Sequence, residues 1–149
     1  MTRSAVAEVP ARGVLVIACS ATKRPDDAWL AAGDRYDGPL WRTWRAHGGP
    51  RVPTFALSAL FGLIPAETEI PDYNVRLGHD VEIAALAPLV RLQASRPPGI
   101  GDVIFVGGAE YVSLLELSGV RVRRLSASGI GYQREALRRW LTDVQGQAS

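Results

Sequence analysis

The chain contains very little cysteine, lysine and histidine, and it has no long apolar run. Its single cysteine, Cys19, excludes an internal disulfide framework and a multi-cysteine metal site, which fits a reducing cytoplasm. The two histidines, His47 and His79, are too few and too scattered to indicate a zinc centre, so we expect no metal and no cofactor. No run approaches the roughly 20 apolar residues of a membrane span, and residues 1–12 lack the apolar core of a signal peptide. We therefore expect a cytoplasmic protein without a membrane partner.

The composition is that of an ordinary folded domain. The 149 residues are 47% hydrophobic and 21% charged, which is enough apolar surface for one core without covalent staples. The interpretation is a mobile N-terminal arm over residues 1–12, a single domain over 13–145 and a short tail over 146–149.

Positive charge is unevenly spread. The formal net charge is only +2, and Lys23 is the only lysine, so arginine supplies almost all the positive charge. Arginines cluster beside Trp41 and Trp44 and again in the last third of the chain. Guanidinium groups suit phosphates, but a net charge of +2 is low for a nucleic-acid-binding surface, and a solvated basic face is the alternative interpretation.

Apolar patterning predicts the fold class. Continuous or alternating apolar runs predict four strands, at residues 14–18, 55–57, 102–106 and 120–125. Helical periodicity predicts helices at residues 26–46 (in two pieces around 33–39), 80–94, 109–117 and 134–144. This order indicates an α/β domain of three layers with a four-stranded, mainly parallel sheet.

Small and polar residues follow every predicted strand. They occupy residues 19–23, 58–62, 107–111 and 126–133. Because the carboxyl ends of parallel strands meet at one edge of a sheet, these segments are expected to converge there. Lys23 could act as a base or nucleophile if burial lowers its pKa, whereas Cys19 is either a small buried hydrophobe or a reactive group.

Two further features favour a ligand site. The proline-bounded loop that carries Asp72, Tyr73 and Asn74 is long for a compact domain, and such loops are more often functional than not. Glycines precede the last two predicted helices, where backbone N–H groups could face a ligand. Their spacing matches neither a P-loop nor the dinucleotide-binding motif.

Several of these segments resemble known families. Residues 57–65 and 70–78 resemble the central motif of the YaaA family of peroxide-stress, DNA-binding proteins. They also resemble small uncharacterised bacterial and phage domains that look related to the uracil-DNA-glycosylase-like domain of archaeosine synthase. The segments Cys19-Ser20-Ala21-Thr22-Lys23, Glu110-Tyr111 and Gly129-Ile130-Gly131-Tyr132-Gln133 are similar to motifs of the same relatives. The chain departs from them at Asp72, which stands between the proline and the tyrosine of the motif.

The resemblance implies a uracil-DNA-glycosylase-like fold and an enzyme that acts on a nucleobase or its N-glycosidic bond. In that hypothesis Tyr36, Phe61 and Tyr73 stack on a base, and Lys23 holds a phosphate with the amides of residues 129–131. The carboxylate that would assist bond cleavage is Asp72, Glu110 or Asp37. The candidate catalytic residues are Lys23, Asp72 and Glu110. The candidate substrate-binding residues are Cys19, Ser20, Tyr36, Ser58, Phe61, Gly62, Tyr73, Asn74, Gly108, Tyr111, Gly129, Gly131 and Gln133.

The alternative function is DNA binding without catalysis, as the YaaA resemblance implies. The phosphate contacts would then come from Arg42, Arg45, Arg121, Arg123 and Arg124. Whichever function holds, the Lys23 ammonium is expected to point into a cleft between residues 58–62 and 129–133. Lys23→Arg should then leave stability nearly unchanged and abolish ligand binding or turnover.

Overall fold

The fold is built on one central sheet, described by a computed structural model that covers residues 14–148. Its five strands lie in the order β4-β3-β1-β6-β7. All neighbouring strands pair in parallel except β3 and β4, which are antiparallel. The strands are β1 (Val14–Ala18), β3 (Thr54–Ser58), β4 (Gly62–Pro65), β6 (Val103–Val106) and β7 (Val122–Arg124). The mainly parallel sheet is confirmed, and the predicted number of four strands was wrong by one.

The unpredicted strand is β4. Gly62 has a φ of +74°, which lets the chain reverse after Ser58 and pair Ser58 with Gly62 and Leu57 with Leu63. The strand is four residues long and begins inside the segment that the sequence pattern assigned to a loop. A separate two-stranded antiparallel sheet, also unpredicted, joins β2 (Leu30–Ala31) to β5 (Glu69–Ile70).

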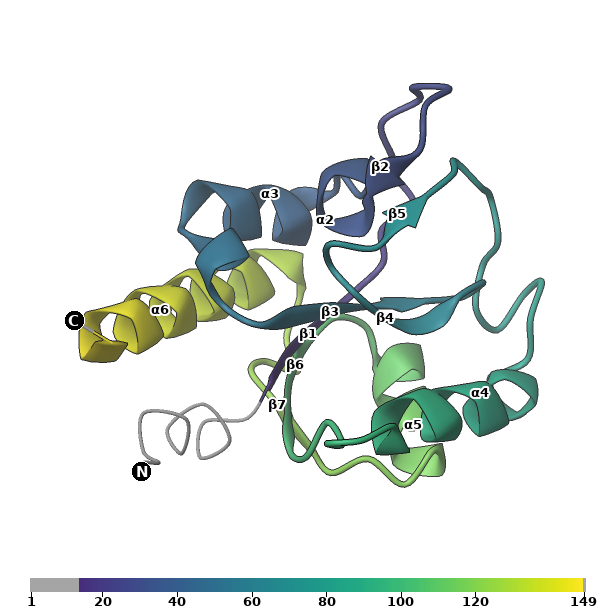
Figure 1. Ribbon diagram of the computed structural model, residues 1–149. Helices are drawn as coiled ribbons and strands as arrows, with labels where there is room; N and C mark the ends of the chain where they lie inside the picture. Colours follow the sequence, from purple (N-terminus) through teal and green to yellow (C-terminus); the bar gives the residue numbers. More distant parts are fainter. Residues whose placement is uncertain (1–13, 149) are drawn as a thin grey trace.

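Helices cover both faces of the sheet (Figure 1). On one face lie α3 (Pro39–Ala46) and α6 (Ile130–Ala148), together with the short α2 (Ala32–Arg35). On the other face lie α4 (Ile83–Ser95) and α5 (Ala109–Leu117). A single 3₁₀ turn, η1 (Gly49–Arg51), leads from α3 towards β3. None of the helices within residues 14–148 is both long enough and apolar enough to cross a membrane.

The central position of β1 in the sheet explains why its sequence is continuously apolar. Leu15 and Ile17 are fully buried in the core under α3 and α6, whereas Val16 and Ala18 belong to the core under α4 and α5. Side chains of a strand alternate between the two faces of its sheet, so a strand covered on both faces needs apolar residues at every position.

The predicted helix over residues 26–46 forms only in part, because hydrogen bonds from Arg35 hold the preceding backbone in an irregular path. Arg35 is 0% exposed, and its guanidinium donates hydrogen bonds to the carbonyls of Arg24, Asp26, Ala28 and Ile70. These bonds hold residues 24–28 around the guanidinium, along a path that differs from that of a helix. Residues 24–29 are therefore irregular, and they carry the exposed Trp29.

The ends of the chain also differ from the prediction. Helix α6 begins at Ile130, four residues before the predicted start, so Gly131 lies inside its first turn. Residues 146–148, expected as a tail, continue this helix. The arm predicted over residues 1–12 lies outside the described residues.

Candidate functional site

The segments that follow the four parallel strands meet at one edge of the sheet. Cys19 follows β1 in the middle of the sheet, with Ser58 at the end of β3 on one side and Gly107 after β6 on the other. Gln133, in the helix after β7, lines the same pocket as Cys19 and Gly108. The convergence expected from the sequence is therefore present, because parallel strands end at one edge.

A chain of hydroxyl groups joins three of these segments. The Tyr73 hydroxyl lies 2.5 Å from the hydroxyl of Tyr36 and 2.8 Å from Ser58 Oγ. Ser58 Oγ also accepts hydrogen bonds from the backbone N–H groups of Leu60 and Phe61, at 3.0 and 2.9 Å. Both lone pairs of Ser58 Oγ are thus occupied, so its own proton points to Tyr73, and either phenol can be the donor in the bond between Tyr73 and Tyr36.

Burial keeps the phenols of the site protonated. The pKa of Tyr73 and that of Tyr36 are raised above their ordinary values, chiefly because both rings are buried away from water. The pKa of Tyr111 is raised for the same reason. Tyr111 lies 3.1 Å, hydroxyl to Sγ, from Cys19. These tyrosines therefore act as neutral hydrogen-bonding groups that fix neighbouring segments.

Lys23 lies against the face of Tyr73. Its Nζ is 4.5 Å from the centre of the Tyr73 ring and 6.0 Å from that of Tyr36, within the range of a cation–π contact. The backbone is held by an antiparallel bridge between Lys23 and Tyr36. Burial lowers the pKa of the Lys23 amine, and electrostatic interactions with Cys19 and Asp72 oppose part of that shift. The ammonium form is therefore less favoured here than in water.

Two pockets open at this edge. A polar pocket of about 470 Å³ is lined by Ala21, Lys23, Asp72, Tyr73 and Asn74. A mainly apolar pocket of about 290 Å³ is lined by Ala18, Cys19, Ser20, Gly38, Pro39, Leu40, Trp41, Gly107, Gly108, Tyr111, Ile130 and Gln133. Residues 18–20 line the apolar pocket and residues 21 and 23 line the polar one, so a single segment serves both.

Gly107 lines the apolar pocket and packs tightly against the core behind it. Its φ is +152°, and a Cβ placed there would lie 2.6 Å from the Cβ of Ala18 and 2.7 Å from the ring of Phe105. On the far side, Gln133 is 8% exposed, and its amide nitrogen donates to the Ser128 carbonyl at 2.8 Å. Within residues 14–148 no hydrogen bond reaches Gln133 Oε1, so this oxygen is available to accept one from a ligand.

Most of the predicted site residues line one of the two pockets or contact a residue that does. Lys23, Asp72, Tyr73 and Asn74 line the polar pocket. Those that line the apolar pocket are Cys19, Ser20, Gly108, Tyr111 and Gln133. Ser58 bonds to Tyr73, and the Phe61 ring packs edge-on against Tyr73 with the ring centres 5.3 Å apart. Gly62 forms the hairpin turn instead, where Gln93 Oε1 would lie 2.4 Å from an added Cβ.

Some predicted roles do not fit the geometry. Tyr36 is 0% exposed, so its ring belongs to the core and has no free face for a base. Glu110 is exposed in the first turn of α5 and lines neither pocket. Asp37 is engaged by Arg45 at 2.6 Å and by Arg42 at 3.3 Å, which leaves Asp72 as the candidate carboxylate nearest to Lys23.

The phosphate site predicted from Lys23 and the amides of residues 129–131 is not formed, because the two segments line different pockets. Lys23 lines the polar pocket, whereas Ile130, which lies between Gly129 and Gly131, lines the apolar one. The two glycines are exposed, and an added Cβ at either would meet no atom within 4 Å. Lys23 and residues 129–131 therefore do not share one cleft, and residues 58–62 line neither pocket. The ammonium lies against Tyr73, whose hydroxyl bonds to Ser58, and not in the expected cleft between residues 58–62 and 129–133.

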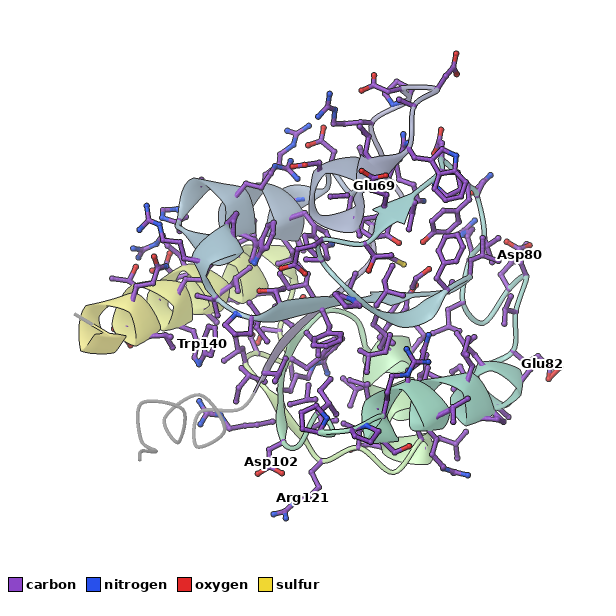
Figure 2. The ribbon with its side chains drawn as sticks, in the orientation of Figure 1. Glu69, Asp80, Glu82, Asp102, Arg121 and Trp140 are labelled. Atoms are coloured by element: carbon purple, nitrogen blue, oxygen red, sulfur yellow. The ribbon has the colours of Figure 1, made fainter. Side chains whose placement is uncertain are left out.

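The predicted basic surface is mostly engaged in internal contacts. Arg42 and Arg45 pair with Asp37, and Arg124 donates to the Gly107 carbonyl at 2.9 Å. Arg121 precedes β7 and lies near Asp102, 3.5 Å away, at the edge of the sheet opposite the two pockets (Figure 2). Arg123, in β7 itself, is exposed. These five arginines do not form one patch around the site.

Sequence reasoning missed one wall of the apolar pocket. Gly38, Pro39, Leu40 and Trp41 come from the start of α3, and the Trp41 indole N–H donates to the Ala18 carbonyl at 2.8 Å. The Gly-Pro pair that opens this helix was the available signal, since proline is favoured in the first turn of a helix. In the part of the chain that the structure describes, no group of three or more His, Cys, Asp and Glu residues could hold a metal ion.

Neither comparison with known proteins assigns the chain to a family: no protein-family model matches it, and no curated protein does.

Proposed function

We propose that the protein acts on a nucleobase or on the N-glycosidic bond that joins a base to its sugar. The observation that carries the proposal is the pairing of two unlike pockets on one segment, residues 18–23. A nucleoside also has two unlike parts, a flat base whose faces stack on apolar surfaces and a polar sugar. A volume of about 290 Å³ is at the small end of ligand pockets, which suits a base and not a larger cofactor.

The apolar pocket supplies contacts suited to a base. Gly107 and Gly108 leave part of its wall without side chains. The free oxygen of Gln133 could accept a hydrogen bond from an N–H group on the edge of the base. Recognition of the base edge by hydrogen bonds is how enzymes that act on extruded bases select them.

The polar pocket supplies groups suited to the sugar and to water. Asp72 and Asn74 are exposed side chains on its wall, beside the Lys23 amine. The Asp72 carboxylate would activate water or stabilise positive charge that develops on the sugar as the N-glycosidic bond breaks. Tyr73, held by Ser58 and Tyr36, keeps the loop that carries Asp72 in place.

We also propose that the domain has the uracil-DNA-glycosylase-like fold and shares ancestry with the YaaA family. Parallel strands between two helical layers, with the pockets at the carboxyl edge, support this proposal. The alternative function, DNA binding without catalysis, has weaker support because its five arginines do not form one patch, and Arg45 and Arg124 are held in internal contacts.

The direct test is release of free base. The protein would be incubated with oligonucleotides and nucleosides that carry modified or damaged bases, and free base would be measured by chromatography and mass spectrometry. We expect release from one class of substrate, and Asp72→Asn should slow it at least about 100-fold, the usual contribution of a general acid or base. Asp143→Asn is the matched control, because Asp143 is exposed on α6 and lines neither pocket.

Two results would contradict the proposal. One is a broad panel that yields neither free base nor bound base. The other is an Asp72→Asn variant that releases base as fast as the parent protein. If no base is released but DNA binds at about 50 mM salt and dissociates as salt rises, DNA binding without catalysis becomes the better description.

A further inference from the structure

We propose that Lys23 is a covalent nucleophile, which forms an imine with the aldehyde of a ring-opened sugar bound in the polar pocket. This inference rests on the proposed function, because hydrolysis of an N-glycosidic bond leaves a sugar whose C1′ is a hemiacetal in equilibrium with an aldehyde. It goes beyond that function by adding a covalent step after, or together with, release of the base.

The first support is that the Lys23 ammonium has no structural partner. Among residues 14–148, no carboxylate lies within ion-pair distance of Nζ, and no acceptor receives a hydrogen bond from it. Its contacts are with the rings of Tyr73 and Tyr36. The contrast with Arg35 is direct, since the guanidinium of Arg35 is bonded to backbone carbonyls. Lys23 is half-buried on the wall of an open pocket, and its amine makes no hydrogen bond or ion pair that stabilises the fold of the described residues.

The second support is that the amine is easier to deprotonate than an ordinary lysine. Burial lowers the pKa of Lys23, and the electrostatic interactions with Cys19 and Asp72 that oppose this shift do not cancel it. Only the neutral amine has the lone pair that attacks a carbonyl carbon. A larger fraction of Lys23 is therefore reactive at neutral pH than of a solvated lysine.

The third support is that the surroundings suit the product. In the reaction, the Nζ lone pair forms a bond to C1′ while the carbonyl oxygen takes up a proton. The resulting carbinolamine then loses water to give a protonated imine. That imine is a cation at the position where the ammonium now lies, 4.5 Å from the centre of the Tyr73 ring, so the ring face stabilises it. Asp72, on the same pocket wall, can take and return the protons that these steps move.

The test is reductive trapping, and the sequence makes it unusually clean. Lys23 is the only lysine, so the only other primary amine is the N-terminal one. The protein would be mixed with sodium cyanoborohydride and one of two probes: an oligonucleotide with a single abasic site, or 2-deoxyribose 5-phosphate. Hydride from the reagent converts an imine to a stable amine, which peptide mapping locates. We expect the adduct on the peptide that contains Lys23.

Two variants separate a reactive lysine from a merely accessible one. Lys23→Arg should lose the adduct on this peptide while its unfolding temperature stays close to that of the parent. The double variant Lys23→Arg/Arg24→Lys moves the amine by one residue, to a position that is exposed and beside Asp26. It should be trapped at least tenfold more slowly than the parent protein.

The outcomes distinguish this inference from the function on which it rests, because neither probe has a base on the sugar that reacts. Trapping at Lys23 without base release from any substrate would leave the imine standing and overturn the proposed function. Base release without trapping would overturn the imine alone. An adduct only at the N-terminus, no adduct with either probe, or equal trapping rates in the parent and the double variant would likewise overturn it.

Discussion

Replacing Tyr73 with phenylalanine removes a single oxygen atom from the centre of the hydroxyl chain. Two hydrogen bonds are lost, the one to Tyr36 at 2.5 Å and the one to Ser58 at 2.8 Å. Ser58 retains the two N–H groups it accepts, but its own proton and the buried Tyr36 hydroxyl lose their partner. At about 0.5–1.5 kcal/mol for each neutral hydrogen bond, Tyr73→Phe should lower the free energy of unfolding by about 1–3 kcal/mol.

The measurement is urea and thermal unfolding of matched variants. For a chain of this size the expected loss corresponds to a fall of about 3–10 °C in the unfolding temperature. Tyr132→Phe removes the same atom from a ring that is 73% exposed and should change stability by less than about 0.5 kcal/mol. Tyr36→Phe breaks only one bond of the chain and should cost less than Tyr73→Phe. If Tyr73→Phe is as stable as the parent, or Tyr36→Phe is the more damaging change, the hydroxyl chain does not hold the loop.

Two further predictions concern the framework of the site. Gly107→Ala should lower the free energy of unfolding, measured by chemical denaturation, by about 2–5 kcal/mol, because the new Cβ would lie 2.6 Å from Ala18 in a backbone already strained by a positive φ. The control is Gly78→Ala, which has a φ of +82° and no atom within 4 Å, so it carries only the strain and should cost about 1–2 kcal/mol. Equal losses in the two variants would refute the contact. Arg35→Lys should lower the free energy of unfolding by about 3–5 kcal/mol and expose residues 24–29 to limited proteolysis, because one ammonium cannot bond all the carbonyls that the guanidinium bonds. The control Arg134→Lys, at the exposed start of α6, should leave stability unchanged. An Arg35→Lys variant that is equally stable would contradict this role of Arg35.

The sheet and the place of the site could be predicted because they depend on patterns that are local in sequence. A continuous apolar run such as residues 14–18 fits only a strand covered on both faces, and its neighbours β3 and β6 carry the same pattern. Once those strands are taken as parallel, the segments after them must meet at one edge. Helix α5 was predicted at its observed ends, residues 109–117, since glycine precedes it and Ser118-Gly119 follows it.

The internal structure of the site could not be predicted, because it depends on contacts between distant residues. The pairing of Tyr36 with Tyr73 joins positions 37 residues apart, and nothing in either segment shows that one tyrosine is buried. Tyrosine suits both a core and a binding surface, so composition alone does not decide between them. The strand β4 was not predicted for a different reason: it is only four residues long, and it lies in a hairpin whose turn depends on the positive φ of Gly62.

Lys23 and Arg35 are neighbouring cations with different surroundings, and only the surroundings of Arg35 serve to stabilise the fold. Arg35 and Lys23 lie on neighbouring strands of backbone, since the Arg24 N–H donates to the Arg35 carbonyl at 2.9 Å and Lys23 pairs with Tyr36. A buried cation is costly unless acceptors surround it, and the guanidinium of Arg35 has them. The Lys23 amine has a ring face and an open pocket instead. Stability of the fold explains the first arrangement, whereas the second is the arrangement that our proposed role of Lys23 as a nucleophile requires.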